Sequence, residues 1–223
     1  MRRAAPCLLP VMALAVAACA PGPSAVPATV ASARPTPSST AVGSLATDLR
    51  QAAGPLAPGS YTRSDFRPPI TFELGEGWSV GSVAAGFFDV QQQQGTPDVI
   101  ALQFARVGSV VGADGATVEA AIAADAVDAI KVNPGLVTIG ESESRLGGQT
   151  GTVVEVENRG PAHAPILDVP AGRLGIDAGR RLWIGLFDTS DGVLAVMVGG
   201  SVAEWENALT LAEPVLESIV IGA

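Results

Sequence analysis

The chain has 223 residues and a formal net charge of −9, and 48% of its residues are hydrophobic but only 4% aromatic. This acidic balance argues against a nucleic-acid partner, which needs a basic face that displaces counterions. One histidine and two cysteines exclude zinc fingers and multi-histidine metal sites. No glycine-rich phosphate motif is present. We therefore predict neither a metal nor a cofactor, and the length predicts one domain with an additional segment.

The N-terminus has the pattern of an export signal. Two arginines precede an apolar stretch over residues 7–18, which is shorter than the ~20 residues of a membrane-spanning helix. The stretch ends in Val16-Ala17-Ala18-Cys19, which resembles the lipobox of bacterial lipoproteins. The resemblance implies a signal peptide over 1–18, cleavage between Ala18 and Cys19, and a lipid on the Cys19 sulfur. An ordinary secreted protein with an incidental cysteine is the alternative.

A tether is predicted after the signal. Residues 20–60 hold seven of the seventeen prolines, and no aromatic residue precedes Tyr61 in the chain. A segment without large apolar groups cannot bury enough surface to offset its ordering entropy. We therefore predict a lipidated and disordered tether over 19–60 and a single globular domain over 61–223. Within the tether, residues 44–53 form either a short helix or a transient turn.

The first half of the domain has strand patterns followed by one helix. Strands are predicted at 69–74, 78–83, 87–92 and 98–107, and in the last of these Ile100, Leu102 and Phe104 alternate onto one face. An amphipathic helix is predicted over 117–132, because its apolar residues fall on one stripe. The helix stops at Asn133-Pro134-Gly135.

The second half has two hairpins and a final helix. The pair 136–144 and 149–158 turns through Gly147-Gly148, and the pair 180–189 and 193–199 is apolar nearly throughout. The latter strands are predicted to be central and covered on both faces. Residues 201–204 match a capping box that opens the last helix, and 219–221 form a closing strand. The order predicts an α+β fold with two main helices on a largely antiparallel sheet.

Two short motifs resemble a known family. Phe72-Glu73-Leu74-Gly75-Glu76-Gly77-Trp78 and the final helix leading into 216–221 are similar to the opening and closing motifs of PsbP-like domains, which include bacterial lipoproteins of the LpqN type. Gly75 stands where that family usually has proline. The resemblance implies an α/β/α sandwich with a non-enzymatic accessory or binding role. It transfers no catalytic residues.

Two motifs could carry chemistry. Gly77 to Gly81 matches G-x-S-x-G around Ser79, and aspartates precede the single histidine, His163. A serine hydrolase needs that serine on a strand-to-helix turn, whereas the sequence after Ser79 is strand-like. Four glutamates in the hairpin of 136–158 could hold calcium, but the register through Gly147-Gly148 puts them on opposite faces. We therefore predict no catalytic and no metal-binding residues.

Residues 159–179 are the most unusual stretch of the domain, with three prolines and four glycines. Long structureless loops in compact domains are uncommon and often functional. One interpretation is a ligand or partner loop that includes His163, Ile166, Leu167 and Asp168. The other is an insertion packed on the edge of the sheet.

These features predict a monomeric, lipid-anchored, extracytoplasmic binding or interaction module of the bacterial cell envelope, attached to the membrane through Cys19. Its expected partner is an envelope protein or a hydrophobic ligand. The alternative function is a carrier of an envelope lipid in an apolar cavity, with room left by the alanine-rich helix of 117–132. A serine hydrolase that uses Ser79 is the third hypothesis.

Overall fold

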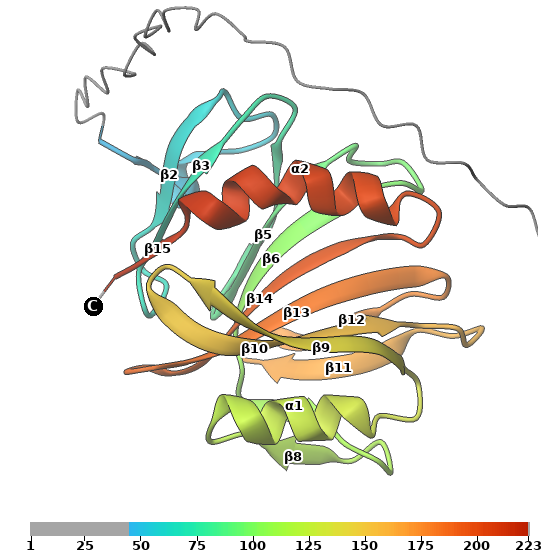
Figure 1. The fold of residues 1–223 in the computed structure, drawn as a ribbon. Coiled ribbons are helices and arrows are strands. Elements are labelled where there is room, and N and C mark those ends of the chain that lie inside the picture. Colours follow the sequence, from blue (N-terminus) through green and yellow to red (C-terminus); the bar gives the residue numbers. More distant parts are fainter. Residues whose placement is uncertain (1–44, 223) are drawn as a thin grey trace, which may run out of the picture. The chain divides into compact units, whose positions relative to one another are not determined.

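The structure is a computed structural model that describes residues 45–222. The signal peptide, the lipobox with Cys19 and the tether up to residue 44 lie outside the described residues. The described residues form three sheets and two α-helices, α1 (Ala123–Lys131) and α2 (Trp205–Ser218) (Figure 1).

The central layer is a seven-stranded antiparallel sheet with the order β4-β5-β6-β14-β13-β10-β9. Each neighbouring pair is antiparallel, and most pairs are hairpins that are consecutive in the chain. The strands are β4 (Ser79–Ala84), β5 (Phe87–Gln92), β6 (Ile100–Arg106), β9 (Val137–Leu146), β10 (Gln149–Glu157), β13 (Arg180–Thr189) and β14 (Gly192–Ser201).

A helix and a small sheet cover each face of the central sheet. The first small sheet packs beside α2, and the second packs beside α1. The first contains β1 (Thr47–Asp48), β2 (Gly59–Arg63), β3 (Ile70–Leu74) and β15 (Val220–Ile221). The second contains β7 (Ser109–Val111), β8 (Thr117–Glu119), β11 (Ala164–Val169) and β12 (Gly172–Ile176).

The predicted α+β fold with a largely antiparallel sheet and two helices is confirmed. Strands β13 and β14 lie inside the central sheet, as their continuous apolar sequence predicts. Ile184 packs into the core on the α1 face, whereas Phe187 and Val198 pack into the core on the α2 face. The register of the β9–β10 hairpin also agrees with the prediction, because Leu146 pairs with Gln149 and Glu141 with Val154.

The boundary at residue 61 is wrong, because part of the predicted tether belongs to the folded domain. The described chain has a short strand, β1, parallel to β2, and a 3-10 turn at Leu49–Gln51. Leu49 is 1% exposed and Leu56 is also buried. Two isolated leucines in a Pro- and Ala-rich segment are too sparse to give a periodic signal, and the turn at 49–51 is all that forms of the short helix considered for 44–53.

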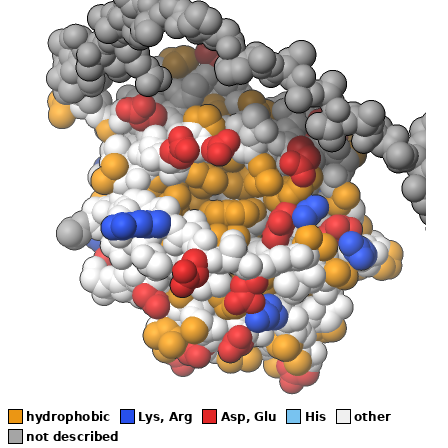
Figure 2. All heavy atoms as spheres, in the orientation of Figure 1, with side chains coloured by type: hydrophobic (Ala, Val, Ile, Leu, Met, Phe, Trp, Pro, Cys, Tyr) orange, Lys and Arg blue, Asp and Glu red, His pale blue; other side chains and the backbone are white. Residues whose placement is uncertain are grey.

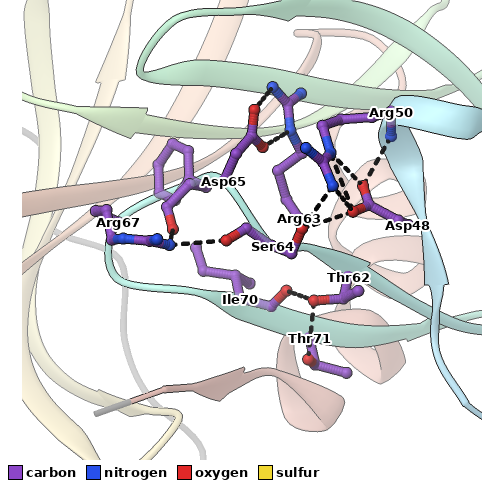
Figure 3. Close-up of polar contacts among 10 residues, drawn as sticks. Asp48, Arg50, Thr62, Arg63, Ser64, Asp65, Arg67, Ile70 and Thr71 are labelled. Atoms are coloured by element: carbon purple, nitrogen blue, oxygen red, sulfur yellow. Dashed lines mark hydrogen bonds and ion pairs between the residues drawn. The ribbon is translucent and has the colours of Figure 1, made fainter.

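Polar contacts fasten this N-terminal segment to β2 (Figure 3). The Asp48 carboxylate accepts hydrogen bonds from the Arg50 guanidinium at 2.7 Å and from the Ser64 hydroxyl at 2.6 Å. The Arg50 hydrogen bond is the main cause that holds the pKa of Asp48 well below its usual range. Close by, the buried Arg63 pairs with Asp65 at 2.5 Å and lies over the Phe88 ring, 5.9 Å from its centroid.

The helix predicted over 117–132 is shorter in the structure. Residues 117–119 form β8, and α1 begins at Ala123. Val118 and Ile122 are therefore about half exposed instead of forming part of the buried stripe. The Asp188 carboxylate accepts a hydrogen bond of 2.7 Å from the Ala123 backbone N–H and so caps the helix start. That capping group comes from the end of β13, where Asp188 pairs with Val193, and cannot be recognised from the local pattern.

The structureless loop predicted over 159–179 is also wrong. Most of it forms the hairpin of β11 and β12, and β11 pairs further with β7. The insertion at the edge of the sheet is not found either, because these strands form a separate sheet that covers the α1 face of the central sheet. The many prolines and glycines of this segment interrupt the alternating pattern that would predict a hairpin.

Substitution of Leu49 tests where the domain begins. We expect Leu49→Ala to lower the free energy of unfolding by about 2–5 kcal/mol, because the leucine is fully buried. Leu45→Ala is the matched control, since Leu45 is 95% exposed, and its effect should stay within about 0.5 kcal/mol. Urea denaturation measures both. Equal effects of the two substitutions would place residue 49 outside the cooperative fold.

A buried carboxylate occupies the irregular pairing of β4 with β5. Asp89 accepts hydrogen bonds from the Ser82 backbone N–H and from the Gln91 side-chain amide. The register shifts at this point of β4, and a Cβ on Gly81 would come within 2.5 Å of the carboxylate. Any larger residue at position 81 would therefore displace the Asp89 carboxylate from these hydrogen bonds. Burial raises the pKa of Asp89 above its ordinary value.

This raised pKa predicts a pH dependence of stability. Between the unfolded pKa of ~3.9 and the raised folded pKa, the folded state binds more protons, so wild-type stability from this group falls as pH rises. The neutral Asp89→Asn variant does not lose stability in this way as pH rises, because residue 89 no longer titrates. We expect its melting temperature relative to wild type to increase between about pH 3.5 and pH 7. The exposed Asp191→Asn control should show a flat difference, and a flat difference for Asp89→Asn would refute the assignment.

Candidate functional site: a groove between two asparagine turns

A groove of about 470 Å³ opens on the α1 side of the domain. One wall is the connection from α1 to β9, and the other is the connection from β10 to β11. The lining is mostly apolar or backbone, and it includes His163 and Arg159 but no carboxylate. Its residues are Val111, Gly115, Asn133–Val137 and Asn158–Pro165.

The first wall is built on the buried Asn133. Its side-chain amide donates to the carbonyls of Val111 at 3.3 Å and Pro165 at 2.8 Å. Its side-chain oxygen accepts from the Gly135 N–H at 2.9 Å, which closes an Asx turn. One side chain therefore joins the end of α1, the end of β7 and the start of β11.

The second wall repeats this arrangement with the buried Asn158. The amide group donates to the carbonyls of Ala162 at 2.7 Å and Ile176 at 2.9 Å. The side-chain oxygen accepts from the Gly160 N–H at 2.9 Å. Both walls thus read Asn-x-Gly in the sequence, and both are fixed by the same set of three hydrogen bonds.

His163 lies at the edge of the groove with about half of its side chain exposed. Its Nδ1 is 2.9 Å from the Asp177 carboxylate. A Cβ on Gly175 would come within 2.5 Å of the His163 Nε2 and closer still to a backbone carbonyl. Glycine at residue 175 is therefore what allows the imidazole to lie against β12.

The other residues of the predicted loop lie away from the groove. Ile166 and Leu167 are fully buried in the core between α1 and the central sheet. Asp168 accepts hydrogen bonds from Arg173 at 2.6 Å and from Thr117 at 3.1 Å, and the Arg173 contact is the main cause that lowers the pKa of Asp168. The structure thus places only His163 of the four at the groove.

The other candidate motifs are parts of strands. Ser79 begins β4 and pairs with Gln91, and β4 continues into β5 through a hairpin. The strand-to-helix turn that raises a catalytic serine is therefore not present at Ser79. Three of the four hairpin glutamates pair with cations: Glu141 with Lys131, Glu155 with Arg181 and Glu157 with Arg159.

The repeated Asn-x-Gly motif is the signal that sequence reasoning missed. The sequence pattern predicts a helix stop at 133–135 and a strand end at Asn158, but it does not indicate that the two segments form one site. Rigid, proline-containing walls reduce the ordering cost when a ligand binds. The mostly apolar lining, with backbone groups, one imidazole at its edge and an Arg159 side chain that is already paired with Glu157, suits binding of an apolar group with few directional hydrogen bonds.

Comparisons with known proteins find similarity only among solved structures. No protein-family model matches the sequence, and no curated protein matches it. The solution structure of CyanoP, the PsbP of Synechocystis sp. PCC 6803, is 14% identical with a TM-score of 0.43, and the match covers 74% of this chain and 92% of that one. LpqN of Mycobacterium tuberculosis, described as involved in cell envelope biogenesis, is 12% identical with a TM-score of 0.43 and the same coverage.

A protein of Bacteroides thetaiotaomicron VPI-5482 is 8% identical with a TM-score of 0.38, and the match covers 69% of this chain and 45% of that one. All three likenesses concern the path of the chain. At these identities no ligand and no site residue can be transferred.

The asparagine turns can be tested through stability. Asn158→Ala leaves two carbonyls and one N–H without their partner, so we expect a loss of about 2–4 kcal/mol in the free energy of unfolding. Asn207→Ala is the control, because Asn207 is exposed on α2, and it should change stability by at most about 0.5 kcal/mol. Chemical denaturation measures both variants. A loss no larger than that of the control would show that the turn does not depend on Asn158.

Proposed function

We propose that this protein is a lipid-anchored, extracytoplasmic binding module of the bacterial cell envelope, which holds an apolar group of a partner or ligand in the groove between the two Asn-x-Gly turns. The observation that carries the proposal is the groove itself, a mostly apolar site of about 470 Å³ whose two walls are fixed by buried asparagines. A prearranged apolar site with few polar groups is typical of binding.

The leader sequence supports the anchor and the location. Its charge, its apolar length and its lipobox-like end at Cys19 agree with one another. Residues 61–223 contain 9 basic and 21 acidic residues, a net charge of −12. An anionic lipid surface repels such a domain, so the lipid on Cys19 supplies the attachment. Among the described residues, no helix combines the length and the apolar character needed to cross a membrane.

The packing of α1 does not favour the alternative of a lipid carrier with a cavity under this helix. Ala126 and Ala129 are buried against the central sheet together with Val127 and Ile130. The small side chains let the helix lie close to the sheet, so they fill the space that was expected to be open. The hydrolase hypothesis finds no support in the strand position of Ser79.

Substitution of the two cysteines tests the anchor. We expect Cys19→Ser to abolish incorporation of labelled palmitate and to release the protein from the membrane fraction. Cys7→Ser is the matched control, because Cys7 lies in the part of the leader that is removed, and it should remain labelled and membrane-bound. Labelling and fractionation of cells measure both. A Cys19→Ser protein that stays lipidated would contradict the anchor.

Blocking the groove tests the binding role. Ala162→Trp puts a large ring into the groove, whereas Ala171→Trp puts the same ring on the exposed β11–β12 turn. Native mass spectrometry of protein purified from its host should detect a bound molecule with the wild type and with Ala171→Trp, but not with Ala162→Trp. Equal binding by all three proteins would place the ligand elsewhere.

A further inference from the structure

A second surface of the domain surrounds α2. One groove, of about 370 Å³, is lined by Trp183, Glu206, Leu209, Thr210, Glu213 and Leu216. We call it the Trp183 groove. On the other side of the helix, the turn groove of about 420 Å³ lies between α2 and the β3–β4 turn. Thr210 borders both grooves, so α2 forms the ridge between them.

The Trp183 groove exposes apolar surface. Trp78 and Trp205 are 2% and 3% exposed, whereas Trp183 is only partly buried. Leu209 and Leu216 of α2 are likewise partly exposed beside it. In Figure 1 no helix lies over β10 and β9 on the side of the sheet that α2 crosses, and Figure 2 shows a band of exposed hydrophobic side chains on this face. Trp183, on β13, is thus only partly covered by the neighbouring α2.

The side chains that line these two grooves carry charge of one sign; the nearest cation of β13, Arg181, lies over the Trp205 ring and pairs with Glu155. Glu206 and Glu213 line the Trp183 groove, Glu73 and Glu76 line the turn groove, and neither lining contains lysine or arginine. Within the described part of the chain, no ion pair involves any of these four glutamates. The glutamates of β9 and β10 differ, because three of them have cationic partners.

Pro214 adds an acceptor to the ridge. Proline lacks an N–H, so it cannot make the helical hydrogen bond to the carbonyl of Thr210. Both residues border the turn groove. The ridge therefore offers a backbone acceptor in addition to the carboxylates. The Gln92 side-chain amide also lines the turn groove, but it already donates to the Glu76 carbonyl.

We propose that α2 and its two grooves bind a cationic amphipathic helix of another protein, with the apolar side chains of that helix against Trp183, Leu209 and Leu216. Glu206 and Glu213 are two helical turns apart, about 10 Å along the axis. Lysine or arginine residues seven apart on a partner helix match that spacing. This surface is separate from the groove of the proposed function, so either can fail without the other.

Charge decides among the possible occupants. A second copy would bring the same unpaired glutamates against these, within a domain of net charge −12. An uncharged acyl chain would fill the apolar floor but leave the carboxylates without partners. A cationic helix satisfies both parts of the surface, and the carboxylates also steer its approach.

Synthetic helices test the proposal on the mature chain, residues 19–223 with Cys19→Ser. The probe is a 14-residue peptide with leucines on one face and lysines seven apart. Calorimetry measures its affinity, and Trp183 emission reports contact because the other tryptophans are buried. We expect binding with a shift of that emission. The double variant Glu206→Gln/Glu213→Gln should weaken binding about ten-fold, as expected for two rim ion pairs.

The matched control is Glu119→Gln/Asp191→Asn, which makes the same change in net charge at exposed residues elsewhere. It should leave the affinity within about two-fold. Equal weakening by both double variants would overturn the proposal in favour of unspecific attraction. So would equal binding of a peptide with glutamates in place of the lysines, or an emission shift only with neutral lipid vesicles. Absence of peptide binding would also overturn it.

Discussion

The fold depends on a pair of strands that must be covered on both faces. Strands β13 and β14 pair over ten residues each, and β14 is buried nearly throughout. Water must therefore be excluded from both sides of the central sheet. One helix alone does not cover a face, and each face carries a small sheet beside its helix. On the α2 face that sheet joins the first and last parts of the domain, because β15 pairs with β3.

The parts of the fold that the sequence could predict are those set by local signals. The β9–β10 register follows from its two-residue turn and was correct, because the turn and the alternation are local. The start of α1 could not be predicted, because the side chain that caps it is Asp188, 65 residues further along the chain. The N-terminal boundary differs from the prediction because Leu49 and Leu56 stand among alanine, proline and polar residues, with no run of large apolar side chains that would indicate burial. Tertiary contacts decided the start of α1 and the N-terminal boundary, whereas local signals decided the hairpin register.

The groove shows the same division between local and tertiary information. Each Asn-x-Gly turn can be read from the sequence, because the Asn side chain and the N–H two residues later form a local hydrogen bond. That both turns face one groove cannot be read, because it requires the long β9–β10 hairpin to return the chain beside the end of α1. The amide groups of Asn133 and Asn158 bond to carbonyls from other strands, Pro165 and Ile176.

The few cations of the domain give its two surfaces different chemistry. The nine basic residues after residue 60 include Arg63, Lys131, Arg159, Arg173 and Arg181, which are all in ion pairs. Arg180 donates instead to two main-chain carbonyls near β6, and burial lowers its pKa. The acidic excess therefore remains on surfaces such as α2, which has three glutamates and no cation. The groove beside His163 has no carboxylate in its lining, so a group that fits one of these surfaces is poorly matched to the other.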